Sequence, residues 1–282
     1  PEALIHVNDA YLARLARYRP NVVVTLIDLG KLTTGWYPRS ASFIHNLNLR
    51  FLGHALGVIC ATEHVRQQII GVLGLPEGMV RVVPVHSLLT PGEPRPSPLP
   101  PSAKLPWNLL CVTTDRPHKN VRFFLELLRA AGDSYQGTIV GRLREETIRL
   151  VRSLGLQDRL TIQNSPEDMR PIYQAAHVLI FPSRFEGFGI PLVEAMSQGV
   201  PVLATRASAI PEVVGDGGIL AEDGNLVAWL AALRRLSDPQ FYCDQSRKAF
   251  RRSQDFSATR TGEALREAYD AFLANARRRG AG

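Results

Sequence analysis

The chain has little cysteine, which limits both its architecture and its chemistry. Its 282 residues include only three cysteines, Cys60, Cys111 and Cys243, with no paired spacing among them. Such a chain has neither the cysteine pairs of a disulfide scaffold nor the Cys and His clusters of a structural zinc site. Cys60 and Cys111 lie in apolar, strand-like runs. We therefore expect buried free thiols in a reducing compartment.

Long apolar runs are absent as well. No stretch approaches the roughly 18 to 20 apolar residues that a membrane-spanning helix needs, and no signal peptide opens the chain. The sequence thus predicts a cytoplasmic protein. Peripheral contact with the inner membrane surface is compatible with this prediction. The formal net charge of +7 favours anionic partners, but the Lys and Arg residues are dispersed and not interleaved with aromatics. Nucleic acid is therefore not an expected partner, whereas nucleotides, phospholipid headgroups or an anionic acceptor are.

A proline-rich stretch divides two regions of alternating strand and helix patterns. Seven prolines lie between Pro91 and Pro106, as is typical of a linker. Before it, the pattern predicts helices over 9–18, 40–53 and 63–73 and strands over 21–26, 56–61 and 79–84. After it, the pattern predicts strands over 108–113, 138–141, 159–163 and 178–181 and helices over 120–131, 145–154 and 166–175. This alternation is typical of α/β proteins with doubly wound parallel sheets, whose ligands lie outside the carboxyl ends of the strands.

The most informative stretch, 181–203, predicts an anion-binding turn. A strand ends at Phe181, a glycine-containing loop follows, Pro191 suits the first turn of a helix, and Gly199 suits its end. The backbone N–H groups from Gly189 to Leu192 would have no intrahelical partner, and the helix dipole adds partial positive charge there. A phosphate is favoured at such a position.

Two acids flank this turn. Glu186 lies in the loop, and Glu194 follows eight positions later, near the start of the helix. This arrangement suits carboxylates that accept hydrogen bonds from the hydroxyls of a sugar nucleotide rather than a metal cage. The chain also has no Asp-x-Asp motif.

The Glu-x7-Glu run, with its Glu-Gly-Phe-Gly and Glu-Ala-Met portions, resembles glycosyltransferase family 4 (group 1). These are retaining GT-B enzymes with two Rossmann-like domains facing a cleft. They generally act without a bound metal, so the resemblance implies no metal site and no cofactor. The resemblance implies that Glu194 binds the nucleotide ribose, Glu186 and the backbone of 188–190 meet the donor sugar, and the Leu192 amide meets the diphosphate. The donor-binding residues it implies are Glu194, Gly187, Phe188, Gly189, Ile190, Pro191 and Leu192.

A second site segment, 112–120, lies between the first strand and the first helix after the linker. In the family, the matching loop ends in a lysine that neutralises the donor diphosphate, here Lys119. His118 replaces an arginine often found beside it, and Thr113 stands where many members have another arginine. Arg116 is the best substitute for the second cation, because its planar fork reaches phosphate oxygens bidentately. The implied catalytic residues are Glu186, Lys119 and Arg116.

The first region departs from the family. The run 22–29 resembles a segment that ends in His-Asp, but Ile27 occupies the histidine position. Asp28 is a candidate contact to sugar or acceptor, although a turn-capping role is nearly as favoured. His6 is the alternative polar contact. Relative to the family, about the first third of the amino-terminal domain is missing. We divide the chain into a partial acceptor-side domain (1–89), the linker (90–106), a donor-binding domain (107–256), and a helix with tail (257–282). The resemblance implies that this helix packs back against the first domain.

The predicted function is a retaining hexosyltransferase that uses a nucleoside diphosphate sugar, with mannose slightly ahead. Its acceptor would be a glycan, a lipid-linked molecule or a small molecule. Ile27 and the incomplete first domain motivate one alternative, a sugar-nucleotide-binding protein or inactive fragment. A GT-B sugar-nucleotide epimerase is another, although such enzymes usually lack the Glu-Gly-Phe-Gly run.

Overall fold

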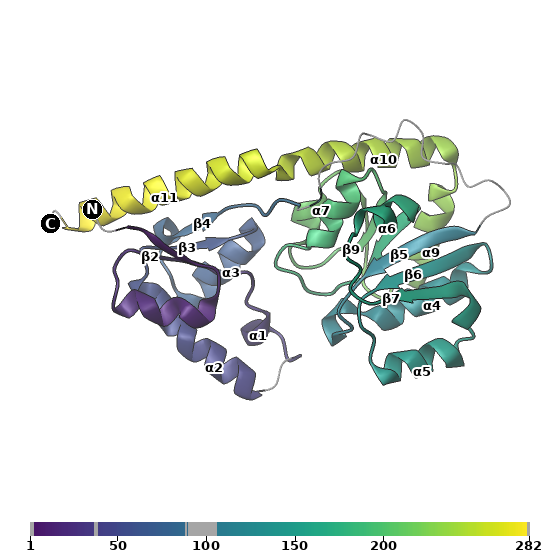
Figure 1. Ribbon diagram of the computed structural model, residues 1–282, viewed down its shortest axis with the longest axis horizontal. Helices are drawn as coiled ribbons and strands as arrows, with labels where there is room; N and C mark the ends of the chain where they lie inside the picture. Colours follow the sequence, from purple (N-terminus) through teal and green to yellow (C-terminus); the bar gives the residue numbers. More distant parts are fainter. Residues whose placement is uncertain (1–2, 37–38, 88, 90–105, 281–282) are drawn as a thin grey trace. The chain divides into compact units, whose positions relative to one another are not determined.

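The computed structural model describes residues 3–36, 39–87, 89 and 106–280, and these form two compact units (Figure 1). Unit 1 comprises Pro1–His86, Glu186–Phe188 and Ala258–Gly282, and unit 2 comprises Ser87–Phe185 and Gly189–Ser257. The predicted linker, 90–106, lies outside the described residues except for Pro106.

Unit 1 contains a parallel four-stranded sheet in the order β1-β2-β3-β4. The strands are β1 (Ile5–Val7), β2 (Val22–Thr25), β3 (Gly57–Cys60) and β4 (Val80–Val82). The helices are η1 (Ala10–Arg17), α1 (Gly30–Thr33), α2 (Arg39–Leu49), η2 (Arg50–His54), α3 (Glu63–Leu73), η3 (Glu77–Met79) and α11 (Ala258–Gly280).

Both faces of the unit 1 sheet are covered. Alternate side chains of a strand point to opposite faces, so β2 places Val22 and Val24 on one face and Val23 on the other. Val22 and Val24 pack in a core with residues of η1, η2 and α3. Val23 packs with Phe272 of α11, and a Cβ at Gly57 would lie 2.4 Å from the Phe272 ring. The last helix therefore supplies the second face of the core of unit 1.

Unit 2 is a parallel six-stranded sheet in the order β10-β9-β8-β5-β6-β7. The strands are β5 (Trp107–Val112), β6 (Tyr135–Val140), β7 (Leu160–Gln163), β8 (Val178–Phe181), β9 (Val202–Thr205) and β10 (Ile219–Ala221). The helices are η4 (Pro117–Lys119), α4 (Val121–Ala131), α5 (Glu145–Ser153), η5 (Gln157–Arg159), α6 (Arg170–Ala175), α7 (Ile190–Ser197), α8 (Ile210–Val214), α9 (Leu226–Leu236), α10 (Pro239–Ser253) and η6 (Gln254–Phe256).

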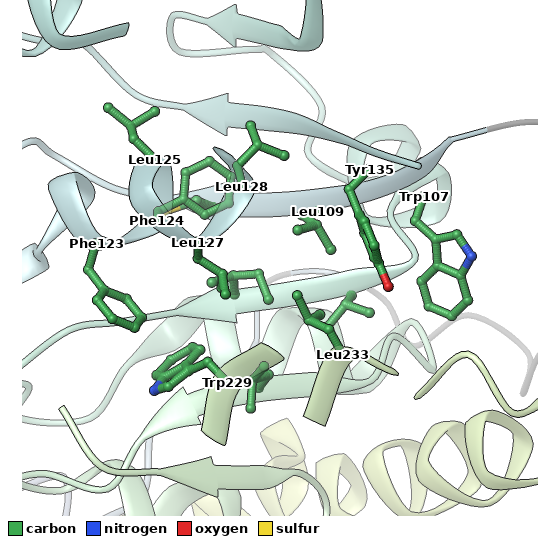
Figure 2. Close-up of a cluster of buried hydrophobic side chains, with 14 of the residues drawn as sticks. Trp107, Leu109, Phe123, Phe124, Leu125, Leu127, Leu128, Tyr135, Trp229 and Leu233 are labelled. Atoms are coloured by element: carbon green, nitrogen blue, oxygen red, sulfur yellow. The ribbon is translucent and has the colours of Figure 1, made fainter. Parts of the chain in front are cut away.

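The helices of unit 2 cover both faces of its sheet. Figure 1 shows α4 and α5 towards one face and α6, α7 and α10 towards the other. Helix α9 lies on the side of α4, because its Trp229 packs against Phe123. The core on the first side joins Leu109 of β5 to Phe124 and Leu128 of α4 and to Trp229 and Leu233 of α9 (Figure 2). Burial of these large apolar side chains holds the sheet and thereby fixes the loops at its carboxyl end.

The prediction of two parallel α/β sheets is confirmed, but one predicted helix start is wrong. The sequence 165–168 predicts a helix beginning at Pro166, whereas α6 begins at Arg170. Ser165 has a φ of 47°, and the carboxylate of Asp168 accepts a hydrogen bond of 2.9 Å from the Arg170 N–H. A bond from an aspartate side chain to the N–H two residues later forms an Asx turn, so the residues just before Arg170 form a turn and not the first turn of the helix.

Candidate active site

The candidate site of unit 2 lies where the order of its strands reverses. The first two strands of the unit, β5 and β6, are neighbours, but β8 pairs with the opposite edge of β5. Such a switch point separates the loops that leave adjacent strands at their carboxyl ends, and ligands of doubly wound folds bind there. The loops are 113–120 after β5 and 182–189 after β8, the two segments that the sequence motifs mark.

Gly189 shapes the opening of α7. Its φ is +96°, and a Cβ there would lie 2.8 Å from a methyl carbon of Leu192 and 3.6 Å from the Phe181 ring. Glycine is required for this backbone turn. The Leu192 N–H already donates to the Gly189 carbonyl at 2.9 Å, contrary to the expectation that this amide lacks an internal partner. Because Pro191 has no N–H, Ile190 provides the first-turn amide best placed for an anion.

Glu194 is held by a tyrosine that sequence reasoning missed. The hydroxyl of Tyr173, a fully buried residue of α6, donates to Glu194 Oε2 at 2.7 Å. Burial raises the pKa of Glu194 above its usual value, while the hydrogen bond from Tyr173 opposes this rise. Burial, the adjacent carboxylate and the hydrogen bond together raise the pKa of Tyr173 well above its usual range, so it stays a donor. The buried Tyr173 hydroxyl therefore fixes the orientation of the Glu194 carboxylate.

Lys119 and the opening of α7 both lie near the ring of Phe181. Its Nζ is 6.0 Å from the centroid of the Phe181 ring, the same ring that Gly189 approaches. Arg116, which precedes η4, is exposed, whereas His118 is only 6% exposed. The structure thus places both Lys119 and the α7 opening near Phe181 and leaves the Arg116 side chain on the surface of the loop that holds Lys119.

The loop after β5 is anchored at its start. A Cβ at Gly141 would lie 1.8 Å from the carbonyl oxygen of Thr113, and Gly141 has a φ of 137°. Asp115, with a φ of 47°, accepts hydrogen bonds from the Arg144 N–H at 2.6 Å and the Thr147 hydroxyl at 3.1 Å. These contacts join the loop to the start of α5, and they hold its backbone in a conformation that few non-glycine residues adopt.

The remaining predicted residues belong to unit 1. Contacts group Glu186–Phe188 with that unit, where the Gly187 carbonyl accepts a hydrogen bond of 3.0 Å from the Thr62 hydroxyl. A Cβ at Gly187 would lie 2.9 Å from that of Asp28. Asp28 Oδ1 also accepts a 2.7 Å hydrogen bond from the Gly30 N–H, so the aspartate does cap a turn. Ile27, at the position where the family has histidine, is 61% exposed.

His6 uses both ring nitrogens within unit 1. Nδ1 lies 2.6 Å from the Tyr269 hydroxyl and Nε2 lies 2.7 Å from the Thr25 hydroxyl. Burial lowers the pKa of His6. A contact from His6 to a sugar or acceptor would therefore require one of these two hydrogen bonds to break.

Metal and membrane features were sought throughout the described residues. Within them, no group of three or more His, Cys, Asp and Glu side chains is arranged to hold a metal ion. None of the helices in this part of the chain has both the length and the apolar character needed to cross a membrane.

Both loop segments at the switch point lie in a region of the chain that matches a protein family model. Residues 107–238 match the family model described as glycosyl transferases group 1. The matched region contains all six strands of the unit 2 sheet. Over 165 residues the chain is 30% identical to O-antigen chain mannosyltransferase B of Escherichia coli, a match that covers 52% of this chain and 42% of that relative. The chain thus spans less than half the length of this curated relative.

Solved structures extend the likeness beyond the glycosyltransferase domain. Sucrose-phosphate synthase from Thermosynechococcus elongatus aligns with a TM-score of 0.79 at 21% identity, over 96% of this chain and 74% of that one. The Anabaena protein Alr3699/HepE in complex with UDP-glucose aligns with a TM-score of 0.77 at 18% identity, over 94% of this chain and 78% of that one. The two parallel-sheet units therefore have the fold of GT-B glycosyltransferases.

Proposed function

We propose that this chain carries the donor site of a glycosyltransferase that takes a hexose, preferentially mannose, from a nucleoside diphosphate sugar. The observation that carries the proposal is the convergence of Lys119 and the opening of α7 beside Phe181, at the switch point of the unit 2 sheet. A cation and a helix start at one place favour a diphosphate. The preference for mannose rests on the named activity of the Escherichia coli relative.

In the proposed donor complex, Glu194 accepts hydrogen bonds from the ribose. Its carboxylate is already oriented by Tyr173, which limits the rotamer entropy lost on binding. The Ile190 amide and Lys119 face the diphosphate, and Arg116 is the adjacent exposed cation. Glu186 and the backbone of 187–189 are assigned to the sugar. Asp28, beside Gly187 in unit 1, is the proposed contact to sugar or acceptor.

The proposed reaction is a retaining transfer. The bond between the sugar C1 and the diphosphate oxygen breaks, and the acceptor hydroxyl oxygen bonds to C1 on the same face. The hydroxyl proton passes to the leaving diphosphate, so that no protein nucleophile is required. The protein contributes stabilisation of the negative charge that develops on the diphosphate, through Lys119 and the first-turn amide of α7. The proposal includes no metal ion.

Calorimetry with UDP, GDP and ADP tests the donor site. We expect at least one of them to bind, and Glu194→Ala to weaken it by about 10- to 150-fold, the loss of a hydrogen bond to a charged group. Glu126→Ala is the control, since it removes an equal charge from an exposed ion pair with Arg122 on α4. Equal affinity in the Glu194 and Glu126 variants would exclude the ribose role.

A second candidate function is sugar-nucleotide binding without transfer. The exposed Ile27 favours it, because this position lies beside Asp28 in unit 1 and holds an apolar side chain without acid-base chemistry. Ile27→His and the unaltered chain should be compared for transfer of labelled sugar to lipid-linked and soluble acceptors. A chain that binds the donor but transfers only with histidine present would support this second function.

A further inference from the structure

One carboxylate links three loops at the carboxyl end of the unit 2 sheet. Asp223, in the loop after β10, accepts through Oδ1 from the Asn120 side-chain amide at 3.1 Å and through Oδ2 from Arg184 Nε at 2.7 Å. Arg184 lies in the loop after β8, and its backbone N–H donates to the His118 carbonyl at 2.7 Å. The contacts form a closed network of Asp223, Asn120, Arg184 and His118, which we call the Asp223 clamp.

The clamp holds both chain neighbours of Lys119. His118 is held through its carbonyl and Asn120 through its side chain, so the backbone on each side of the lysine is fixed. Asn120 has a φ of 52°, a left-handed conformation that costs free energy for a residue with a side chain. Its bond to Asp223 helps to offset that cost. The clamp therefore sets the direction in which Lys119 leaves the loop.

The Asp223 clamp contains one negative and one positive side chain, Asp223 and Arg184. A carboxylate near a diphosphate site would repel the ligand unless a cation neutralised it. Arg184 provides that cation, and its bond to Asp223 orients the guanidinium towards the carboxylate. The pair adds no net charge to the site, and the positive charge of Lys119, which lies near Phe181, stays unneutralised by Asp223. An ion pair that orients three loops fits a positioning role better than direct ligand binding.

We infer that Asp223 is a positioning residue that holds Lys119 for the diphosphate of the donor. This inference rests on the proposed function and deepens it, because it makes affinity for the phosphates depend on a residue that does not touch them. It predicts that loss of Asp223 weakens binding of nucleoside diphosphates and leaves the nucleoside portion unaffected.

The experiment measures the affinity of the full chain for UDP, GDP and ADP by calorimetry and for uridine, guanosine and adenosine by NMR titration. Asp223→Ala should weaken the nucleoside diphosphate that binds by about 5- to 30-fold and leave its nucleoside unchanged. Asp223→Asn keeps an acceptor for the Asn120 amide and should weaken nucleoside diphosphate binding less than Asp223→Ala does. It provides a second test variant in case Asp223→Ala does not fold. Glu222→Ala is the matched control, because the adjacent Glu222 pairs with Arg206 at 3.3 Å and lies outside the clamp.

A double-mutant cycle with Lys119→Ala decides whether Asp223 acts through the lysine. In the Lys119→Ala background, Asp223→Ala should cause no further loss, since the group that it positions is gone. Equal losses from Asp223→Ala in both backgrounds, unchanged diphosphate affinity, or an equal loss of nucleoside affinity would each overturn the inference while the proposed function stands. If the unaltered chain bound none of UDP, GDP and ADP, the proposed function would fall and the inference with it.

Discussion

Replacing Tyr173 by phenylalanine tests whether Glu194 is an ionised, partly buried carboxylate. The change deletes the hydroxyl that donates to Glu194 Oε2 at 2.7 Å and keeps the ring that fills a fully buried site. At neutral pH the lost bond is charge-assisted, so we expect unit 2 to lose about 1.5 to 3 kcal/mol of stability. At about 2 to 4 °C per kcal/mol, its Tm falls by about 3 to 12 °C.

The loss should depend on pH in a defined direction. The pKa of Glu194 is raised by burial, and the Tyr173 hydrogen bond lowers it, so the variant has a still higher pKa. A carboxyl whose folded pKa is raised contributes stability that is present below its unfolded pKa and lost as pH rises through the folded pKa. Below that window Glu194 is protonated in both proteins, and the bond that is lost is a neutral one of about 0.5 to 1.5 kcal/mol.

Urea unfolding of both proteins at about pH 4 and pH 7 measures the difference. Two controls separate the electrostatic part from the loss of a hydroxyl. Tyr242→Phe removes a buried hydroxyl that donates to the His177 carbonyl at 2.7 Å, a neutral bond, and should cost less at pH 7. In a Glu194→Gln background the pH dependence of the Tyr173→Phe loss should vanish. A loss of equal size at both pH values in the otherwise unaltered chain would refute the reasoning.

Two further predictions concern the phosphate cations and the last helix. Lys119→Ala should lower sugar transfer or donor hydrolysis by about 10- to 1000-fold with little change in Tm, because it removes one preorganised charge contact outside the core. Arg116→Ala should lower it less, and a larger kinetic effect of His118→Ala at unchanged Tm would assign the second cation to the histidine instead. Phe272→Ala should destabilise unit 1 by about 3 to 5 kcal/mol, measured by urea unfolding, because it empties the site that packs against Gly57 and Val23. Leu273→Ala on the same helix is its control, since Leu273 is 40% exposed, and an equal loss in both variants would contradict the packing described for Phe272.

Local signals explain which elements could be predicted from sequence. Helix α3 occupies the predicted range, Glu63–Leu73, because the hydroxyl of Thr62 caps its start and Gly74, with a φ of 65°, ends it. Strand β8 likewise matches its apolar run, 178–181. Both patterns depend on residues adjacent in the chain, where propensity and capping act directly.

The parts that sequence reasoning missed depend on long-range contacts. Tyr173 and Glu194 are separated by 21 positions, and Asn120 and Asp223 by 103, so no local spacing marks either pair. Arg184 lies inside the recognised motif, but only the folded chain pairs it with Asp223. The use of the Leu192 amide within α7 also depends on the exact backbone turn at Gly189.

The packing of α11 on the unit 1 sheet has a consequence for biosynthesis. The ribosome makes β2 and β3 early, but one face of their sheet stays uncovered until Phe272 has been translated. All of unit 2, by contrast, is available once Ser257 has emerged. The strands of unit 1 are therefore made before unit 2, but their core is completed after it. During that interval Val23 and Ile59 present bare apolar surface, the kind of surface that molecular chaperones recognise on nascent chains.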